Sequence, residues 1–552
     1  MSFSATTSGG RVARAGRVTA TLIFAFALLW PIVWVAWNGW TLTGLYEESV
    51  GYRYFYSLRA LYEPSASLFM PHGQTVELVQ KLVQLGLTAA GYPPTQVEPR
   101  IDYFVYASVF IFQLLNIAAF AWMVAAIRSF SGAILSATFW ALPFYTAGLS
   151  APYTLLHPDY HALEAGFALL TAGTMIRTAQ RPGLEIGRAI WMGVFAGLAI
   201  STKVTLAIFP MACLGHMLLT GAISDLRQTA RFVMVGLALC MSIFLAAVLI
   251  ETGLDWSEAA RHFIGLYHFI RGNSGGGFVV SDQSWPRWLV GKVAGWDWTY
   301  LSAVYISPVI AAAFVAVSTT RRQLAIAVSF LCASIASSIA IYRRDYAVTL
   351  IEAGFLFHAM IYTNVWAILS GRLARALPEL QLITAVVALA LIYVGNPATI
   401  GAIVASAGPN TLDQVKLADL QRHLDGRRLW IVLDNSYRPL SIDSAIMKGG
   451  FSETHSPLVE SMFPDVDYVF METGKFPIEF HRYGAIIFPY RGPLDDFVAM
   501  LSRKYSIPLV GLPCEHFITA SSQAIGICRS SGDHKKPAAR GPGSGMGGAH
   551  AR

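Results

Sequence analysis

Charged residues are scarce in this sequence. They make up 13% of its 552 residues, against about 25% in soluble globular domains. Cysteine is rare as well, and five cysteines in a chain of this length exclude a small disulfide-rich scaffold. Apolar residues reach 55%, and the mean hydropathy is +0.50. These proportions exclude an ordinary soluble enzyme, a disordered chain and a fibrous repeat, and they indicate a polytopic membrane protein.

Long apolar runs recur along the first 400 residues. A helix needs about 20 apolar residues to cross about 30 Å of hydrocarbon, and by this measure the runs predict about eleven transmembrane helices. The pair 189–201 and 204–220 is short, and Lys203 lies between its members, which indicates that one of the two is a partial or broken helix. The predicted spans are 18–39, 102–127, 131–150, 160–176, 189–201, 204–220, 231–250, 299–319, 323–342, 346–369 and 379–397.

Arginines predict the orientation of these spans. Positive charges concentrate in cytoplasmic loops, and arginines occur before the first span and then in every second connection. The net charge of +7 is therefore typical of membrane-edge loops and not of a nucleic-acid surface, so no nucleic-acid partner is expected. The pattern predicts a protein of a bacterial-type inner membrane, with a cytoplasmic N-terminal segment (1–17) and a C-terminal region outside. The arginines are Arg11, Arg14, Arg17, Arg128, Arg177, Arg181, Arg188, Arg227, Arg231, Arg321, Arg322, Arg372 and Arg375.

Two long loops, 40–101 and 252–298, are expected on the outer side of the membrane region 18–400. Residues 76–86 (VELVQKLVQLG) alternate apolar and polar side chains in a helical pattern, which predicts an amphipathic helix lying in the membrane interface. Loop 252–298 contains five tryptophans. They fit either residues at the lipid headgroup level or a platform on which a sugar ring stacks.

The character of the sequence changes after about residue 405, where charge and turn residues return. Segments 429–435, 468–472, 483–490 and 506–512 are typical of buried strands, and 494–505 of a helix. They predict a small extracytoplasmic α/β domain over 405–530, with a disulfide between Cys514 and Cys528 in an oxidising compartment. The Gly/Pro/Lys-rich tail 531–552 is predicted to be disordered.

Two groups of acidic residues are predicted to lie on the outer face. Glu47 and Glu48 follow the first span, and adjacent carboxylates there suit a cation site or a general base, or else a solvated loop. Pro158 favours an extended backbone at His157. In an extended segment residues two apart point the same way, so the side chains of His157, Asp159 and His161 can converge. Imidazole with carboxylate suits Zn or Mn, and carboxylate with phosphate oxygens suits Mg or Mn. The alternative is a polar helix cap.

Three basic residues are predicted at the same face. Lys203 ends the segment Gly197–Lys203 between two apolar runs, where it suits a phosphate better than a snorkelling role. Arg343 and Arg344 lie on the face that otherwise has few positive charges, and a guanidinium binds phosphate oxygens bidentately. The alternative for either arginine is an ion pair with Asp345 or another loop.

The order of these features resembles the GT-C superfamily, polytopic glycosyltransferases that use polyprenyl-phosphate sugars and include protein O-mannosyltransferases and lipid A aminoarabinose transferases. The resemblance lies in the acidic pair of the first outer loop, the second acidic position at His157–Pro158–Asp159, the Gly-Leu-rich segment ending in Thr202–Lys203, the late Arg-Tyr element around Arg343 and the outer C-terminal domain. The chain departs from the family in having Glu47–Glu48 instead of Asp-Glu, which leaves the base open between the two.

The resemblance implies inverting glycosyl transfer on the extracytoplasmic face. Glu47, Glu48 and Asp159 would be catalytic, and Lys203, Arg343 and Arg344 would bind the donor phosphate, helped by a divalent cation (Mg, Mn or Zn) if His157, Asp159 and His161 hold one. The partners would be a polyprenyl-phosphate-linked sugar, a lipid, glycan or protein acceptor, and membrane lipids. The alternatives are a polytopic transporter or flippase, and a polysaccharide-assembly protein without transferase activity.

Overall fold

The structure is a computed structural model. It describes residues 5–37, 73–92, 97–145, 155–156, 158–220, 225–273, 284–294, 306–343, 347–373, 428–432, 466–470, 483–490, 492–505, 508–518 and 524–529. The chain divides into two compact units. The first comprises Met1–Asn410 and Ser444–Met462, and the second comprises Thr411–Asp443 and Phe463–Arg552.

The first unit is helical throughout its described part. Its helices follow the apolar runs of the sequence closely, because a backbone in hydrocarbon must satisfy its own hydrogen bonds. The helices are α1 (Ala5–Trp37), α3 (Gln74–Ala89), α4 (Val97–Val124), α5 (Phe130–Tyr145), the 3-10 helix η1 (Tyr160–Leu163), α7 (Glu164–Gln180), α8 (Ile186–Thr202), the 3-10 helix η2 (Val204–Ala207), α9 (Ile208–Thr220), α10 (Leu226–Glu251), α11 (Trp256–Asn273), α12 (Trp285–Ala294), α14 (Ser307–Val317), α15 (Arg321–Arg343) and α16 (Ala347–Leu373).

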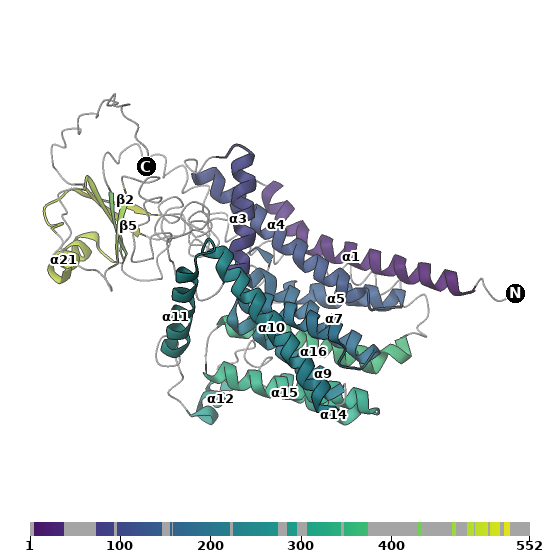
Figure 1. Ribbon diagram of the computed structural model, residues 1–552. Helices are drawn as coiled ribbons and strands as arrows, with labels where there is room; N and C mark the ends of the chain where they lie inside the picture. The colour runs from purple at the N-terminus through teal and green to yellow at the C-terminus, as the bar shows by residue number, and fades with distance from the viewer. Residues whose placement is uncertain are drawn as a thin grey trace, which may run out of the picture. The chain divides into compact units, whose positions relative to one another are not determined.

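Most of the long helices of this unit pack side by side in a bundle (Figure 1). Helix α1 lies against α4 and α5, α7 lies against α4, α9 and α16, and α15 lies against α9, α14 and α16. Aromatic rings fill the layer between α1, α4 and α5, where Phe24 stacks on Phe120 and meets Phe144 edge-on. Helices that are far apart in sequence, such as α7 and α16, are therefore neighbours, and this brings their polar residues together.

Four helices of the described part are long and apolar enough to cross a membrane: Gly10–Trp37, Tyr103–Val124, Leu226–Glu251 and Arg321–Ile339. Four shorter apolar helices accompany them: Phe130–Phe144, Ile186–Thr202, Val204–Thr220 and Ser307–Val317. A polytopic membrane protein is thus consistent with both sequence and structure. The count of eleven remains a prediction, and the last predicted span, 379–397, lies outside the described residues.

Helices α8 and α10 approach each other closely at two glycines. A methyl group at Gly193 would lie 2.6 Å from the backbone oxygen of Gly236, and one at Gly197 would lie 2.7 Å from Ile243 Cβ. The small-xxx-small spacing of Gly193 and Gly197, visible in the sequence, is therefore an actual helix–helix contact. It fixes α8, whose C-terminal end carries Lys203.

Gly193→Ala is expected to lower the free energy of unfolding by about 1–3 kcal/mol, because the added methyl overpacks a backbone contact. The matched control is Gly187→Ala on the same helix, where a methyl group would meet nothing within 4 Å. We expect the control to leave stability unchanged or slightly raised. Unfolding of both variants in detergent checks this, and equal stability of the two would contradict the packing role.

The second unit contains a five-stranded sheet in the order β2-β1-β3-β5-β4. Strands β1 (Arg428–Val432), β2 (Val466–Phe470) and β3 (Ala485–Tyr490) are parallel, and β5 (Ala524–Arg529) runs antiparallel to β3 and to β4 (Cys514–Ile518). Helix α21 (Leu494–Tyr505) packs Val498 and Leu501 against Ile486 and Phe488 of β3. The predicted helix 494–505 and the first three predicted strands are confirmed.

The predicted strand 506–512 is wrong where the structure describes it. Residues 508–512 form a turn, in which Leu512 N donates to Leu509 O at 3.1 Å and Gly511 has φ +89°. Pro508 has no N–H to donate to a sheet, and Leu509 is buried as a core residue of the turn, so its apolar character misled the prediction. The predicted disulfide is confirmed, since Cys514 and Cys528 are bonded and lie opposite each other on β4 and β5.

Candidate functional site

Lys203 lies at a break between two helices, as predicted for the pair 189–201 and 204–220. Helix α8 ends at Thr202, and Lys203 has an extended backbone (φ −167°, ψ 133°) before η2 begins. Thr202 Oγ1 donates to Leu198 O at 2.7 Å, a bond that competes with the helix ladder in its last turn. The break turns Lys203 away from the run of the helix and into the bundle, where its side chain is only 12% exposed.

The lysine meets a carboxylate that sequence reasoning missed. Lys203 Nζ forms a short ion pair with Glu352 Oε1 of α16, and Thr205 Oγ1 donates to the same oxygen at 2.7 Å. Nζ also lies 4.6 Å from the centre of the Tyr160 ring. Glu352 is 1% exposed. A solitary acidic residue inside the apolar run 346–369 was the available sign, because a carboxylate within a membrane span requires a partner.

Asp159 and His161 do not lie on one extended segment, which differs from what the alternation of the sequence suggested. Asp159 is extended and caps η1, accepting from Tyr160 N at 2.6 Å, and the 3-10 turn then ends the alternation. His161 Nδ1 instead donates to Glu164 Oε1 at 2.9 Å. No group of three metal-binding side chains occurs among the residues that the structure describes. His157 lies outside those residues, so the metal site of His157, Asp159 and His161 stays a prediction.

Glu164 opens α7 at the centre of this cluster and is fully buried. It lies within electrostatic range of Glu352, Lys203 and Asp159. Its Oε2 has no hydrogen-bond partner within the described part of the chain. Three carboxylates and one lysine therefore share a region of low solvent access, which gives the cluster an excess of negative charge unless a proton or a ligand compensates it.

Helix α4 holds the segment around Asp159 in place through two side-chain hydrogen bonds. Gln113 Nε2 donates to Leu155 O at 3.0 Å, and Asn116 Nδ2 donates to Ala162 O at 2.6 Å. Gly166 leaves room for this contact, because a methyl group there would lie 2.6 Å from Asn116 Oδ1. Polar residues of an apolar helix are thus used to fix the backbone on both sides of Asp159.

Helix α3 covers the cluster with its polar face. The predicted amphipathic helix 76–86 is present, but Glu77, Gln80 and Lys81 are buried while Leu82 and Leu85 are exposed. Most of the polar residues face the protein together with Val76 and Val83, while Leu82 and Leu85 face out. Gln80 Nε2 donates to Pro158 O at 2.7 Å, directly before Asp159.

Further contacts tie α3 to the helices around it. Thr75 Oγ1 lies 2.6 Å from Oγ of Ser201, the residue two before Lys203. Gln74 Nε2 donates to His262 Nε2 of α11 at 3.2 Å. Burial lowers the pKa of His262 to about 4, so its ring is neutral at pH 7 and can accept this bond. Burial also lowers the pKa of Lys81, and the charges of Glu251 and Glu77 partly oppose that shift.

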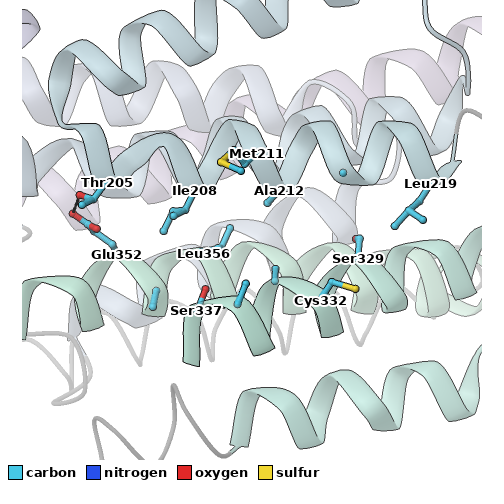
Figure 2. Close-up of a pocket in the computed structure, with 14 residues that line it drawn as sticks. Thr205, Ile208, Met211, Ala212, Leu219, Ser329, Cys332, Ser337, Glu352 and Leu356 are labelled. Carbon is cyan, nitrogen blue, oxygen red and sulfur yellow. Dashed lines mark hydrogen bonds between the residues drawn. The ribbon is translucent and has the colours of Figure 1, made fainter. Parts of the chain in front are cut away.

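An apolar groove of about 500 Å³ begins at Thr205 and Glu352, the two partners at the helix break, and extends between three helices. Figure 2 shows Thr205 and Glu352 side by side at one end and Leu219 at the other. Most of the residues between them are small or apolar. They are Ile208, Met211, Ala212 and Gly215 of α9, Ser329, Cys332, Ala333, Ala336 and Ser337 of α15, and Ala353 and Leu356 of α16.

The remaining predicted site residues are only partly covered by the structure. Glu47, Glu48 and Arg344 lie outside the described residues. Arg343 is the last residue of α15, and three residues separate it from the start of α16, the helix that carries Glu352. The structure thus brings together Asp159 and Lys203 through Glu164, and it adds Glu352, Thr205 and the polar face of α3.

Comparison with known proteins gives little to set beside this geometry. No family model matches the chain, and no curated protein matches it. Among solved structures, it is similar to a crystal structure of the Archaeoglobus fulgidus oligosaccharyltransferase in complex with Zn and sulfate, with 14% identity and a TM-score of 0.39. The match covers 70% of this chain and 53% of that one, so the chain spans about half the length of the matched structure. At these values the similarity assigns neither a family nor an activity to the chain.

Proposed function

We propose that this protein is an integral-membrane glycosyltransferase that moves a sugar from a polyprenyl-phosphate donor to an acceptor hydroxyl. One observation carries the proposal: the apolar groove has Thr205 and Glu352 at one end, and Glu352 pairs there with Lys203, in the same cluster as Glu164 and Asp159. A lipid phosphate has an apolar tail and an anionic head, and this arrangement offers apolar side chains for one and an ammonium for the other. The neighbouring carboxylates supply the basic groups that a sugar transfer requires.

The reaction assigned to this site is an inverting displacement. A carboxylate, Asp159 or one of Glu47 and Glu48, takes the proton of the acceptor hydroxyl, and the acceptor oxygen forms the new bond to the anomeric carbon. The bond from that carbon to the phosphate oxygen breaks, and its electron pair leaves with the lipid phosphate. Lys203, with Arg343 or Arg344, stabilises the leaving charge. A divalent cation (Mg, Mn or Zn) would be held by His157, Asp159 and His161, and no step is assigned to it.

The test is transfer from a labelled polyprenyl-phosphate sugar by membranes that contain the protein. We expect the label to appear in an acceptor, which can be a lipid, a glycan or a protein, and free polyprenyl phosphate to accumulate in equal amount. A transporter or flippase would move the intact donor across vesicles without releasing lipid phosphate. An assembly protein without transferase activity would do neither, so either result would contradict the proposal.

The orientation proposed from the arginines places the C-terminal unit and the candidate site outside the cytoplasm of a bacterial-type cell. A phosphatase that is active only outside the cytoplasm should be active when fused after residue 405 and inactive when fused at Arg181. Equal expression of the two fusions is the control. An inactive fusion after residue 405 together with an active one at Arg181 would reverse the proposed topology.

A further inference from the structure

We infer that Glu352 is the exchangeable counterion of Lys203: it occupies the lysine while the site is empty and yields it to the phosphate of the lipid ligand. The inference rests on the proposed function and deepens it, because it assigns a role to a residue that belongs to neither the base nor the phosphate-binding cations. It also states how an anionic ligand enters a site that is already rich in carboxylates.

The contacts show that the lysine is engaged. Both polar contacts to Glu352 Oε1 come from the segment around the helix break, the ion pair from Lys203 and the hydrogen bond from Thr205. The Glu352 side chain is 2% exposed, so the pair is shielded from water. A phosphate that is to bind Lys203 must therefore compete with a carboxylate that already holds it.

The charges around the pair make simple sharing unfavourable. Glu164 and Asp159 lie in the same cluster, so a phosphate that bound beside Glu352 would add an anion to a group of acidic side chains that share one ammonium. Like charges in a region of low dielectric repel strongly, and a buried charge without its partner is costly. Exchange avoids this cost, because one anion replaces another on Lys203. Glu352 can leave the lysine toward the groove that its own side chain lines.

The exchange also accounts for release of the product. The donor phosphate is a diester with one negative charge, whereas the polyprenyl phosphate left after transfer is a monoester with about −1.5 to −2 charge at pH 7. The product would therefore hold Lys203 more tightly than the donor does. A carboxylate that returns to the lysine opposes this retention, so Glu352 favours turnover over product inhibition.

The experiment measures binding of polyprenyl phosphate, polyprenol and inorganic phosphate to the full-length protein in detergent. Glu352→Gln removes the competing charge while keeping an oxygen for Thr205, and we expect it to bind polyprenyl phosphate about tenfold more tightly than the wild type. Polyprenol, which lacks the phosphate, should bind equally to both. Tighter binding of inorganic phosphate as well would show that the headgroup alone is sufficient for the exchange. In transfer assays, the variant should show stronger inhibition by added polyprenyl phosphate.

Glu164→Gln is the matched control, because it makes the same substitution in the same cluster at a residue without a direct contact to Lys203 among the described residues. Tightening that is equal in the two variants, or absent in folded Glu352→Gln, would overturn the counterion role. Thr205→Val is a second, isosteric variant that releases Glu352 Oε1 without changing charge, and it should tighten binding severalfold. If Glu352→Gln does not fold, unchanged affinity in Thr205→Val overturns the inference.

Different results would refute the proposed function and the exchange of Glu352 for the phosphate. A wild-type protein that binds polyprenyl phosphate no better than polyprenol would refute the proposed function, and the inference with it. A wild type that binds and transfers, with a Glu352→Gln variant that binds no more tightly, would leave the function in place and refute only the exchange.

Discussion

Asp159→Asn is expected to lower the rate of sugar transfer by about 10²–10⁴-fold, the usual effect of removing a general base. The asparagine side chain retains an oxygen that can accept from Tyr160 N, so the cap of η1 and the path of the chain should persist. What is lost is the negative charge beside Glu164 and Lys203. By the same reasoning, at least one of Glu47→Gln and Glu48→Gln should abolish transfer, because the sequence leaves the base open among these carboxylates.

The matched control is Asp225→Asn. Asp225 caps α10 in the same way, accepting from Arg227 N at 2.9 Å and from Gln228 N at 3.2 Å, but it belongs to the exposed end of that helix. The same substitution should leave transfer within about twofold of the wild type, because surface changes away from a site are small. Turnover should be measured at equal amounts of folded protein. Near-normal transfer in Asp159→Asn and both glutamine variants would remove the catalytic assignment from this region.

The helices of the first unit were predictable because a long apolar run indicates a helix in a sequence of this composition. A run that must cross hydrocarbon has to bond internally, and this fixes α4, α10 and α15 to within a few residues. The break at Lys203 was also visible, since a charge between two short apolar runs marks a place where the helix cannot continue unchanged. The direction in which α3 faces was not predictable, because an amphipathic helix can bury either side and only the surrounding polar groups decide.

The C-terminal unit shows the limits of short apolar segments. A run such as 508–512 is apolar because Leu509 is buried in a turn, and burial in a turn and burial in a strand leave the same composition. The disulfide was easier to predict, because Cys514 and Cys528 are the two cysteines outside the predicted spans.

The site was only half predictable for a similar reason. Lys203 and Asp159 stand out as polar residues at the edges of spans, but their partners come from other helices. Glu352 is 149 residues from Lys203 and Gln80 is 78 from Pro158, and pairing over such distances depends on helix packing that one sequence does not reveal. In the predicted trio of His157, Asp159 and His161, local alternation did not indicate the 3-10 turn that follows the extended Asp159, and His157 lies outside the described residues.

Lys203→Met should destabilise the protein by about 3–5 kcal/mol, the cost of leaving a buried charge without its partner. Methionine keeps most of the volume of the lysine stem, so the loss is electrostatic. It removes from the buried Glu352 and Glu164 the ammonium that lies near them. Glu352→Gln should cost less, because an amide still accepts from Thr205, and Lys203, at 12% exposed, is closer to water.

The double variant Lys203→Met with Glu352→Gln separates the energy of the Lys203–Glu352 interaction from the effects of the single substitutions. Removing both charges should recover part of the loss seen in Lys203→Met alone, since no carboxylate at 352 then remains unpaired. The surface control is Arg261→Met, which breaks the pair with Glu258, where the arginine is 67% exposed. Exposed pairs contribute about 0–1 kcal/mol, so this variant should change stability little. Unfolding midpoints in one detergent give the comparison. A Lys203→Met variant as stable as Arg261→Met, or a double variant less stable than Lys203→Met, would mean that Glu352 does not depend on Lys203 for its charge compensation.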